Sequence, residues 1–240
     1  MKSQSAARKR AGALVVRWRS RIGFADALAQ QEILVEKKWR DSAQADEFWL
    51  LEHDPVYTIG RTPDQSSLRG ARHLPHPLFE INRGGQATYH GPGQLIGYLL
   101  LDLRRYGQDL HRYLRWIEAL LIELLQTYEI SARTREGLTG VWVDDRKIAS
   151  IGVGVRHWIT MHGFALNVSG DLAPFEQITP CGIANVRMTS IQVESGMAPS
   201  LAAVAELAAK LAMVRIDDLS SAETVAGQRA RVELLNLVAR

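Results

Sequence analysis

The segment Leu110–Tyr128 constrains the fold more than any other part of the chain, because its apolar residues recur at spacings of three and four. Those spacings place side chains on one face of an α-helix, and Asp109 stands where a helix cap is expected. The sequence therefore predicts a helix whose apolar face consists of Leu110, Tyr113, Leu114, Ile117, Leu120, Leu121, Leu124, Leu125 and Tyr128.

Short apolar runs on both sides of this helix predict strands. We expect these at Ala13–Trp18, Phe48–Leu51, Leu95–Leu101, Val141–Val143, Ile148–Val155 and Ile159–Val168, with a tight turn at Asp144–Arg146. Further helices are expected at Phe24–Trp39, at Ser200–Val214 and at Ser220–Val238, where Ser220 or Ser221 is the cap. Because strands and helices do not alternate regularly, the order favours an α+β domain over a doubly wound sheet. We expect a mixed, mainly antiparallel sheet with flanking helices.

The length of 240 residues fits one catalytic domain, which we place at residues 11–240, with residues 200–240 as a helical C-terminal part. Residues 1–10 are expected to be a basic, flexible N-terminus. Basic residues are frequent up to Arg21, although the net charge is only +3. They are interpreted either as a solvated terminus or as a surface for an acidic partner. No nucleic-acid motif accompanies them, so nucleic acid is not an expected partner.

Cys181 is the only cysteine, so the chain cannot form an internal disulfide or a cysteine-based zinc site. The seven histidines show no metal-site spacing, and we expect no metal. The apolar run Ala11–Val16 is too short for a signal peptide, and no run is long enough to cross a membrane. These features predict a cytoplasmic protein that does not act on membranes.

Glycine is concentrated in the segment Arg83–Gln94, which lies between two apolar segments. Glycines let a backbone approach a ligand and turn its N–H groups toward an oxyanion, although a hairpin with tight turns is the simpler interpretation. The segment matches neither the P-loop nor the dinucleotide-binding motif.

Lys147 and Cys181 are each unremarkable alone. Lys147 follows a predicted turn, where a solvated lysine is the ordinary interpretation. Cys181 stands between Pro180 and Gly182, which predicts a turn. A free thiol titrates at about 8.5 and needs a nearby cation to be a good nucleophile. A Cys–His pair with His90 or His162 is a second possibility that spacing does not decide.

Several motifs together resemble the lipoate-biosynthesis octanoyltransferases, the LipB family. The order of the motifs and the spacing of Lys147 from Cys181 also resemble that family. Asp54, where many relatives have proline, is a minor departure. The resemblance covers Arg17–Ile191 and rests on Glu52–Gly60, Arg83–Gly85, His90–Gln94, Gly140–Val143, Arg146–Gly152, His162–Asn167 and Pro180–Gly182.

This resemblance implies the fold of biotin and lipoate protein ligases. It also implies transfer of an octanoyl group from octanoyl-acyl carrier protein to a lysine of a lipoyl domain. Those domains belong to 2-oxoacid dehydrogenase E2 subunits and the glycine cleavage H protein. The intermediate would be a thioester on Cys181, with Lys147 as the catalytic partner. The acyl site would comprise Arg83, Gly84, Gly85, Gln86, Ala87, Thr88, Tyr89, His90, Ser150, Ile151, Gly152, Gly163, Phe164 and Ala165.

The chemistry is consistent with this hypothesis. The Lys147 ammonium favours the thiolate of Cys181, and Lys147 can act first as acid and then as base. Oxyanion donors are expected near Cys181, at Gly84–Gly85 or in a Lys147–Ser150 turn. No cofactor is required, because acyl transfer from a thioester needs no ATP. The alternatives are an ATP-dependent ligase of the same fold, an enzyme that moves octanoyl between proteins, a hydrolase, and a non-enzymatic module that binds carrier proteins. We expect a monomer.

Overall fold

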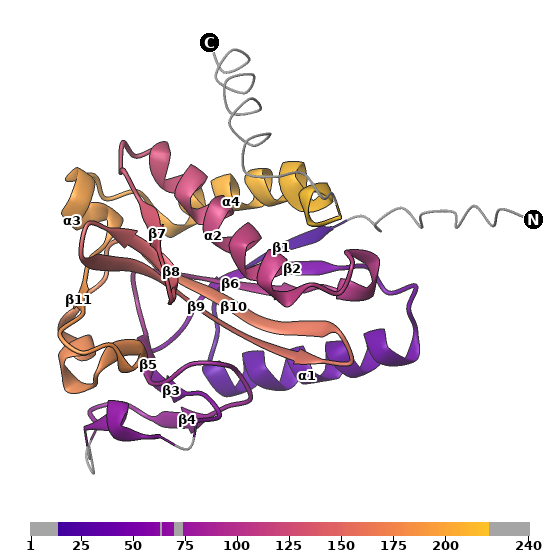
Figure 1. Cartoon of the computed structure of the whole chain (residues 1–240), viewed down its shortest axis with the longest axis horizontal. Coiled ribbons are helices and arrows are strands. Elements are labelled where there is room, and N and C mark those ends of the chain that lie inside the picture. Colours follow the sequence, from indigo (N-terminus) through magenta and orange to yellow (C-terminus); the bar gives the residue numbers. More distant parts are fainter. Residues whose placement is uncertain (1–13, 63, 70–73, 221–240) are drawn as a thin grey trace, which may run out of the picture.

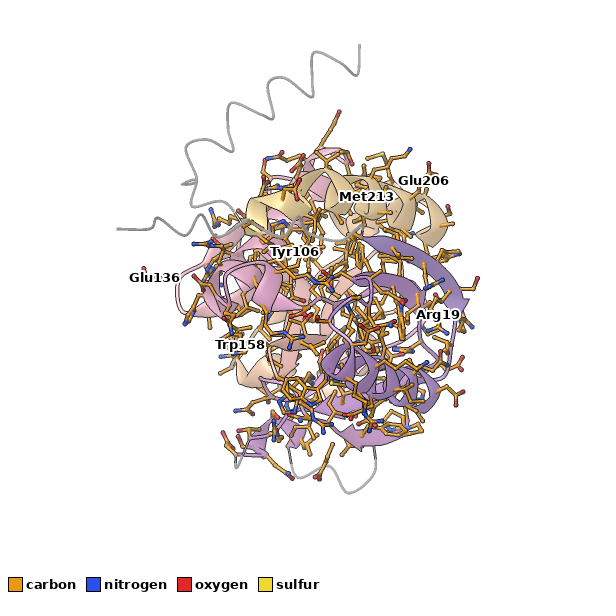
Figure 2. The ribbon with its side chains drawn as sticks, turned by 90° about the vertical axis from the view of Figure 1, so that its right-hand side faces the viewer. Arg19, Tyr106, Glu136, Trp158, Glu206 and Met213 are labelled. Atoms are coloured by element: carbon orange, nitrogen blue, oxygen red, sulfur yellow. The ribbon has the colours of Figure 1, made fainter. Side chains whose placement is uncertain are left out.

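The computed structural model describes residues 14–62, 64–69 and 74–220. Within them, an eight-stranded sheet carries α1 (Phe24–Arg40) on one face and α2 (Leu110–Gln126) and α4 (Leu201–Arg215) on the other (Figure 1). Figure 2 shows the same layers from the side, with Glu206 and Met213 marking α4. Two expectations lie outside the described residues. They are the basic N-terminus at residues 1–10 and the helix at Ser220–Val238, of which only Ser220 is described.

The large sheet is mixed, as predicted. β1 is parallel to its neighbour β2, the next strands in the order β2-β6-β10-β9-β8-β7 are antiparallel, and β11 runs parallel beside β9. The bounds are β1 (Val15–Arg21), β2 (Glu47–Glu52), β6 (Gln94–Leu100), β7 (Arg133–Arg135), β8 (Leu138–Val143), β9 (Arg146–Arg156), β10 (Ile159–Asn167) and β11 (Arg187–Met188).

The helix predicted around Leu110–Tyr128 is confirmed as α2. Asp109 caps it by accepting a hydrogen bond from the backbone N–H of Arg112, and Ser200 caps α4 in the same way through Ala203. The apolar face of α2 is buried against α4 and the sheet, where Leu120, Leu121 and Leu124 are fully buried. Burying one such side chain contributes about 1.5–3 kcal/mol, so this layer stabilises the sheet that carries the site.

A second sheet of three strands was not predicted. It is formed by β3 (Val56–Ile59), β4 (Leu78–Glu80) and β5 (Thr88–His90), with β3 in the middle. The glycine-rich segment was expected to be a loop from Arg83 to His90. Its last three residues, Thr88–His90, instead form strand β5. Three-residue strands carry too few positions for a periodic signal, and β5 forms because β3 pairs with it from far along the chain.

The hairpin of β8 and β9 also differs from the prediction. The turn occupies Asp144 and Asp145, and β9 begins at Arg146, so Lys147–Ser150 is strand and not turn. The remaining elements are α3 (Ile191–Ser195) and the short 3-10 helices η1 (Ser66–Leu68), η2 (Leu103–Arg105), η3 (Ala173–Gln177), η4 (Pro180–Gly182) and η5 (Ile216–Leu219). None of the helices in the described ranges is both long and apolar enough to span a bilayer.

Candidate active site

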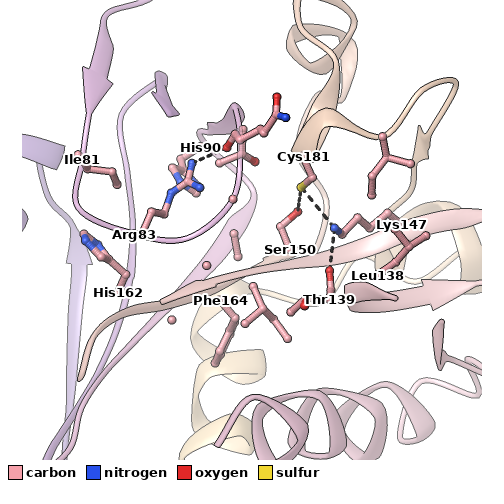
Figure 3. Close-up of a pocket in the computed structure, with 18 of the residues that line it drawn as sticks. Ile81, Arg83, His90, Leu138, Thr139, Lys147, Ser150, His162, Phe164 and Cys181 are labelled. Carbon is pink, nitrogen blue, oxygen red and sulfur yellow. Dashed lines mark hydrogen bonds between the residues drawn. The ribbon is translucent and has the colours of Figure 1, made fainter. Parts of the chain in front are cut away.

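Lys147 and Cys181 meet at one wall of a pocket (Figure 3). The Nζ atom of Lys147 donates a hydrogen bond to the carbonyl of Thr139 at 3.0 Å and contacts Sγ of Cys181 at 3.3 Å. The hydroxyl of Ser150 lies 3.7 Å from the same sulfur. Lys147 is only 1% exposed, so the solvated-lysine interpretation is wrong. A buried cation thus lies beside a half-buried thiol.

The β8–β9 hairpin determines where the Lys147 side chain can go. Gly140 has φ 129°, and a Cβ there would lie 2.6 Å from Cε of Lys147 and 2.7 Å from the carbonyl oxygen of Ala149. A side chain at position 140 would therefore collide with the lysine and strain the backbone. The Trp142 ring lies 5.2 Å from Nζ and offers its negative face to the ammonium. The Lys147 side chain therefore lies in a narrow channel between Gly140 and Trp142, and its Nζ ends at the sulfur of Cys181.

Glu118, a buried carboxylate on the apolar face of α2, supports this channel. Its Oε1 accepts a hydrogen bond from the backbone N–H of Gly140 at 3.0 Å, and its Oε2 accepts one from Arg115 at 2.6 Å. Glu118 therefore holds the 139–140 backbone, whose Thr139 carbonyl binds Lys147. In the sequence Glu118 is only one charge in a leucine-rich helix, and no local pattern indicates its role.

We expect Glu118→Leu to destabilise the protein by about 1–3 kcal/mol, because the buried N–H of Gly140 loses its acceptor. Glu118→Gln keeps an oxygen acceptor at the same place and serves as the matched control. Urea denaturation of both variants measures the difference. Equal stability of the two variants would show that the Gly140 hydrogen bond contributes nothing.

Cys181 adopts a left-handed backbone conformation, with φ 56°, inside η4. Its N–H donates to the carbonyl of Ala87 at 2.8 Å, and the N–H of Gly182 donates to Thr179 at 2.9 Å. The N–H of Gly84 likewise donates to Val153 at 3.0 Å. These three groups, which we expected to stabilise an oxyanion, are therefore already engaged with main-chain carbonyls. The Nζ of Lys147 is the donor that stands at the sulfur.

The pocket has a volume of about 200 Å³ and contains most of the residues expected there. Gly84, Ala87 and Tyr89 do not line it. Tyr89 points into a separate apolar cluster with Tyr57 and Phe175, because successive residues of a strand face opposite sides. The expected residues that do line the pocket are Arg83, Gly85, Gln86, Thr88, His90, Lys147, Ser150, Ile151, Gly152, Gly163, Phe164, Ala165 and Cys181.

Other lining residues were not predicted by sequence reasoning as part of the acyl site. Phe24 begins α1 and Tyr98 is in β6, and both looked like ordinary core residues. His162 was named as part of a family motif and as a possible partner for the cysteine, but not as part of the acyl site. The remaining such residues are Ile81, Gly137, Leu138, Thr139 and Ile183. No local pattern could have found Phe24 or Tyr98, because they reach the pocket only when distant elements pack together.

Arg83 forms a rigid part of the pocket wall. The residue is only 8% exposed. Its guanidinium donates hydrogen bonds of 2.9–3.0 Å to the carbonyls of Thr58, Gly84 and Gln86 and to the hydroxyl of Thr58. Burial lowers the pKa of Arg83 from its usual value, yet a guanidinium stays protonated in proteins. The residue therefore ties the glycine-rich segment to β3 and brings a positive charge to the pocket.

The histidines around the pocket are neutral. Nδ1 of His90 lies 2.8 Å from Oε1 of Gln94, whose amide nitrogen donates to Asn167, so His90 carries its proton on Nδ1. The hydrogen bonds found at Sγ in the described part of the chain involve Lys147 and Ser150 and no histidine. The geometry therefore favours a lysine–cysteine pair over a cysteine–histidine pair.

The buried histidines make stability depend on pH. Burial lowers the pKa of His90 to about 3 and that of His162 to about 4. The unfolded chain binds these protons below about pH 6.5, whereas the folded chain does not, so stability is lost as the pH falls from about 6.5 toward 4. We expect the free energy of unfolding to fall by up to about 1.4 kcal/mol per pH unit for each histidine.

Urea denaturation at pH 7.5, 6.5 and 5.5 measures this dependence. His90→Gln should show a shallower dependence, because one of the buried imidazoles is gone. A free energy of unfolding that stays constant over this range would contradict the prediction.

The fold and the site together define the class of protein. A family description of the lipoyl protein ligase A/B catalytic domain matches residues 24–211. A solved putative lipoate protein ligase from T. acidophilum superimposes with a TM-score of 0.63 at 15% identity and covers 85% of each chain. Biotin protein ligase from Aquifex aeolicus superimposes with a TM-score of 0.51 at 13% identity, over 88% of this chain and 71% of the ligase. The predicted fold is thereby confirmed.

The nearer relatives define the family more narrowly. An octanoyltransferase from Geobacter sp. (strain M21) is 51% identical over 175 residues, which cover 73% of this chain and 83% of the relative. An octanoyltransferase from Geobacter sulfurreducens is 48% identical over 197 residues, which cover 82% of each chain. The chain belongs to the octanoyltransferases of the lipoyl protein ligase A/B catalytic-domain family.

Proposed function

We propose that this protein transfers an octanoyl group from octanoyl-acyl carrier protein to a lysine of a lipoyl domain, as a step of lipoate biosynthesis. The observation that carries the proposal is the contact of 3.3 Å between the buried Nζ of Lys147 and Sγ of Cys181 at the wall of a pocket. The names of the relatives support the octanoyl group as the cargo.

In the first half-reaction the thiolate of Cys181 attacks the thioester carbonyl of the carrier. A bond forms between Sγ and the carbonyl carbon, and the bond to the carrier sulfur breaks. Lys147 gives a proton to the departing thiolate and becomes a neutral amine. The products are an octanoyl thioester on Cys181 and the free thiol of the carrier.

In the second half-reaction the amine of the acceptor lysine attacks the thioester on Cys181. The neutral Lys147 takes a proton from that amine, the amide bond forms, and the cysteine sulfur leaves as thiolate. The enzyme returns to its starting state of thiolate and ammonium. Arg83 and His90 shape the acyl pocket and transfer no proton.

The proposal extends to the protein as a whole. Residues 11–240 form one catalytic domain that acts as a monomer in the cytoplasm, where a single thiol stays reduced. Its acceptors are lipoyl domains of 2-oxoacid dehydrogenase E2 subunits and the glycine cleavage H protein. The basic N-terminal segment docks the acidic carrier. On β1, however, Arg17 and Arg21 already pair with Glu47 and Glu52, at 2.7 and 2.8 Å.

The experiment mixes the protein with octanoyl-acyl carrier protein in the absence of ATP and measures its intact mass. We expect the mass of one octanoyl group on Cys181, and transfer of that group once a lipoyl domain is added. A solved lipoate-protein ligase A of the same fold binds ATP. If this protein were an ATP-dependent ligase, we would expect the opposite pattern: activity that needs ATP and survives loss of Cys181. Faster release of octanoate than transfer would indicate a hydrolase.

A further inference from the structure

The acyl pocket has two chemically different ends. Figure 3 shows Cys181, Lys147 and Ser150 on one side and His162, Arg83 and Ile81 on the other. Apolar side chains such as Phe164 line the space between them. An acyl chain carried on the sulfur therefore runs toward the histidine side, where the end of the chain meets polar groups.

Most of the polar groups at the far end are paired. Tyr98 donates to Nε2 of His53 at 2.7 Å, His90 is held by Gln94, and Arg83 reaches backbone carbonyls. His162 lines the pocket and is 3% exposed, yet its Nε2 has no hydrogen-bond partner among the described residues. A buried polar atom without a partner is costly and rare, which makes this imidazole a candidate to bind a ligand.

The distance along the sheet fits the length of the acyl group. Ser150 contacts the cysteine sulfur, and His162 pairs with Val153, three residues further along β9. Three residues of strand advance about 10 Å. An extended chain advances about 1.2 Å per bond, so the seven C–C bonds of an octanoyl group span about 8 Å. An octanoyl chain on Cys181 is therefore long enough to reach the part of the pocket that His162 lines.

We propose that this end of the pocket is a polar subsite built on His162, and that medium-chain acyl groups with a terminal hydroxyl are substrates of the enzyme. The inference rests on the proposed acyl transfer through Cys181. The hydroxyl takes part in no covalent step: it donates to or accepts from the neutral imidazole, and either role satisfies the unpaired nitrogen. The subsite thus selects the end of the chain by hydrogen bonding.

Two other pocket-lining atoms, Oε1 of Gln86 and Oγ1 of Thr88, also have no partner in the described part of the chain. Gln86 lies at the cysteine end, because a Cβ on Gly182 would be 2.6 Å from its side chain. Thr88 is the competing group, since it shares β5 with His90. Thr88→Val removes its hydroxyl with almost no change of shape and is the matched control.

The experiment compares octanoyl- and 8-hydroxyoctanoyl-acyl carrier protein as donors to a lipoyl domain and measures kcat/KM for each. We expect the wild type to use the two donors within about threefold of each other, whereas an apolar pocket would reject the hydroxyl by tenfold or more. His162→Leu should lower the ratio for hydroxyoctanoyl over octanoyl by about tenfold. Thr88→Val should leave that ratio as it is.

The outcomes separate this inference from the proposed function. Rejection of hydroxyoctanoyl by a wild type that transfers octanoyl overturns the inference alone. An unchanged ratio in His162→Leu, or a fall in Thr88→Val instead, overturns the assignment to His162. Failure to transfer either chain overturns the proposed function, and the inference with it. Because octanoyl is measured on every variant, loss of folding lowers both rates and leaves the ratio readable.

Discussion

Cys181→Ser is expected to lose the octanoyl adduct and to lower transfer to a lipoyl domain by at least about 10³-fold. The reason is that a hydroxyl at this position is a far weaker nucleophile than a thiol, and Lys147, as an ammonium, cannot accept the proton of the hydroxyl. Intact mass after incubation with octanoyl-acyl carrier protein measures the adduct, and a coupled lipoyl-domain assay measures the transfer.

The structure predicts that this variant still folds. The serine side chain is only slightly smaller than that of cysteine. The backbone N–H at position 181 can still donate its hydrogen bond to the carbonyl of Ala87. The urea midpoint of Cys181→Ser should therefore stay close to that of the wild type. Transfer that persists at the wild-type rate in this folded variant would exclude a thioester on Cys181.

Lys147→Met is expected to lower transfer by about 10²–10⁴-fold. Methionine fills the channel between Gly140 and Trp142 with a side chain of similar length but brings no charge and no proton. Without the ammonium, less of the thiol is ionised at neutral pH, so alkylation of Cys181 by iodoacetamide should slow about tenfold or more at pH 7. Raising the pH should restore the alkylation rate but not the transfer, which needs the acid and base as well.

Lys147→Arg tests whether any cation suffices. The guanidinium is larger than the ammonium, and the channel is already tight, since a Cβ on Gly140 would be 2.6 Å from Cε of Lys147. We expect this variant to recover part of the alkylation rate at most, and little transfer, because arginine does not give up its proton. An alkylation profile of Lys147→Met that superimposes on the wild type would show that Lys147 does not activate the cysteine.

The long elements of the fold were predictable from sequence because their signal is periodic. α2 follows closely the segment that predicted it, since burial of one helix face demands spacings of three and four. β10 is buried along its whole length, and its long apolar run predicted it. The three-stranded sheet was missed because β4 and β5 have three residues each and depend on pairing with β3. Pairing between distant short segments leaves no local pattern.

The sequence by itself determined the family, through motifs whose order and spacing recur in octanoyltransferases, and it singled out Lys147 and Cys181 as a pair. Only the tertiary structure decided that Lys147 is buried, that its Nζ reaches the sulfur, and that Gly140 and Glu118 hold the backbone around it. It also decided that His162, and not His90, carries an unpaired nitrogen at the far end of the pocket. The physical reason is that burial and hydrogen bonding depend on which distant segments pack together, and those contacts exist only in the folded chain.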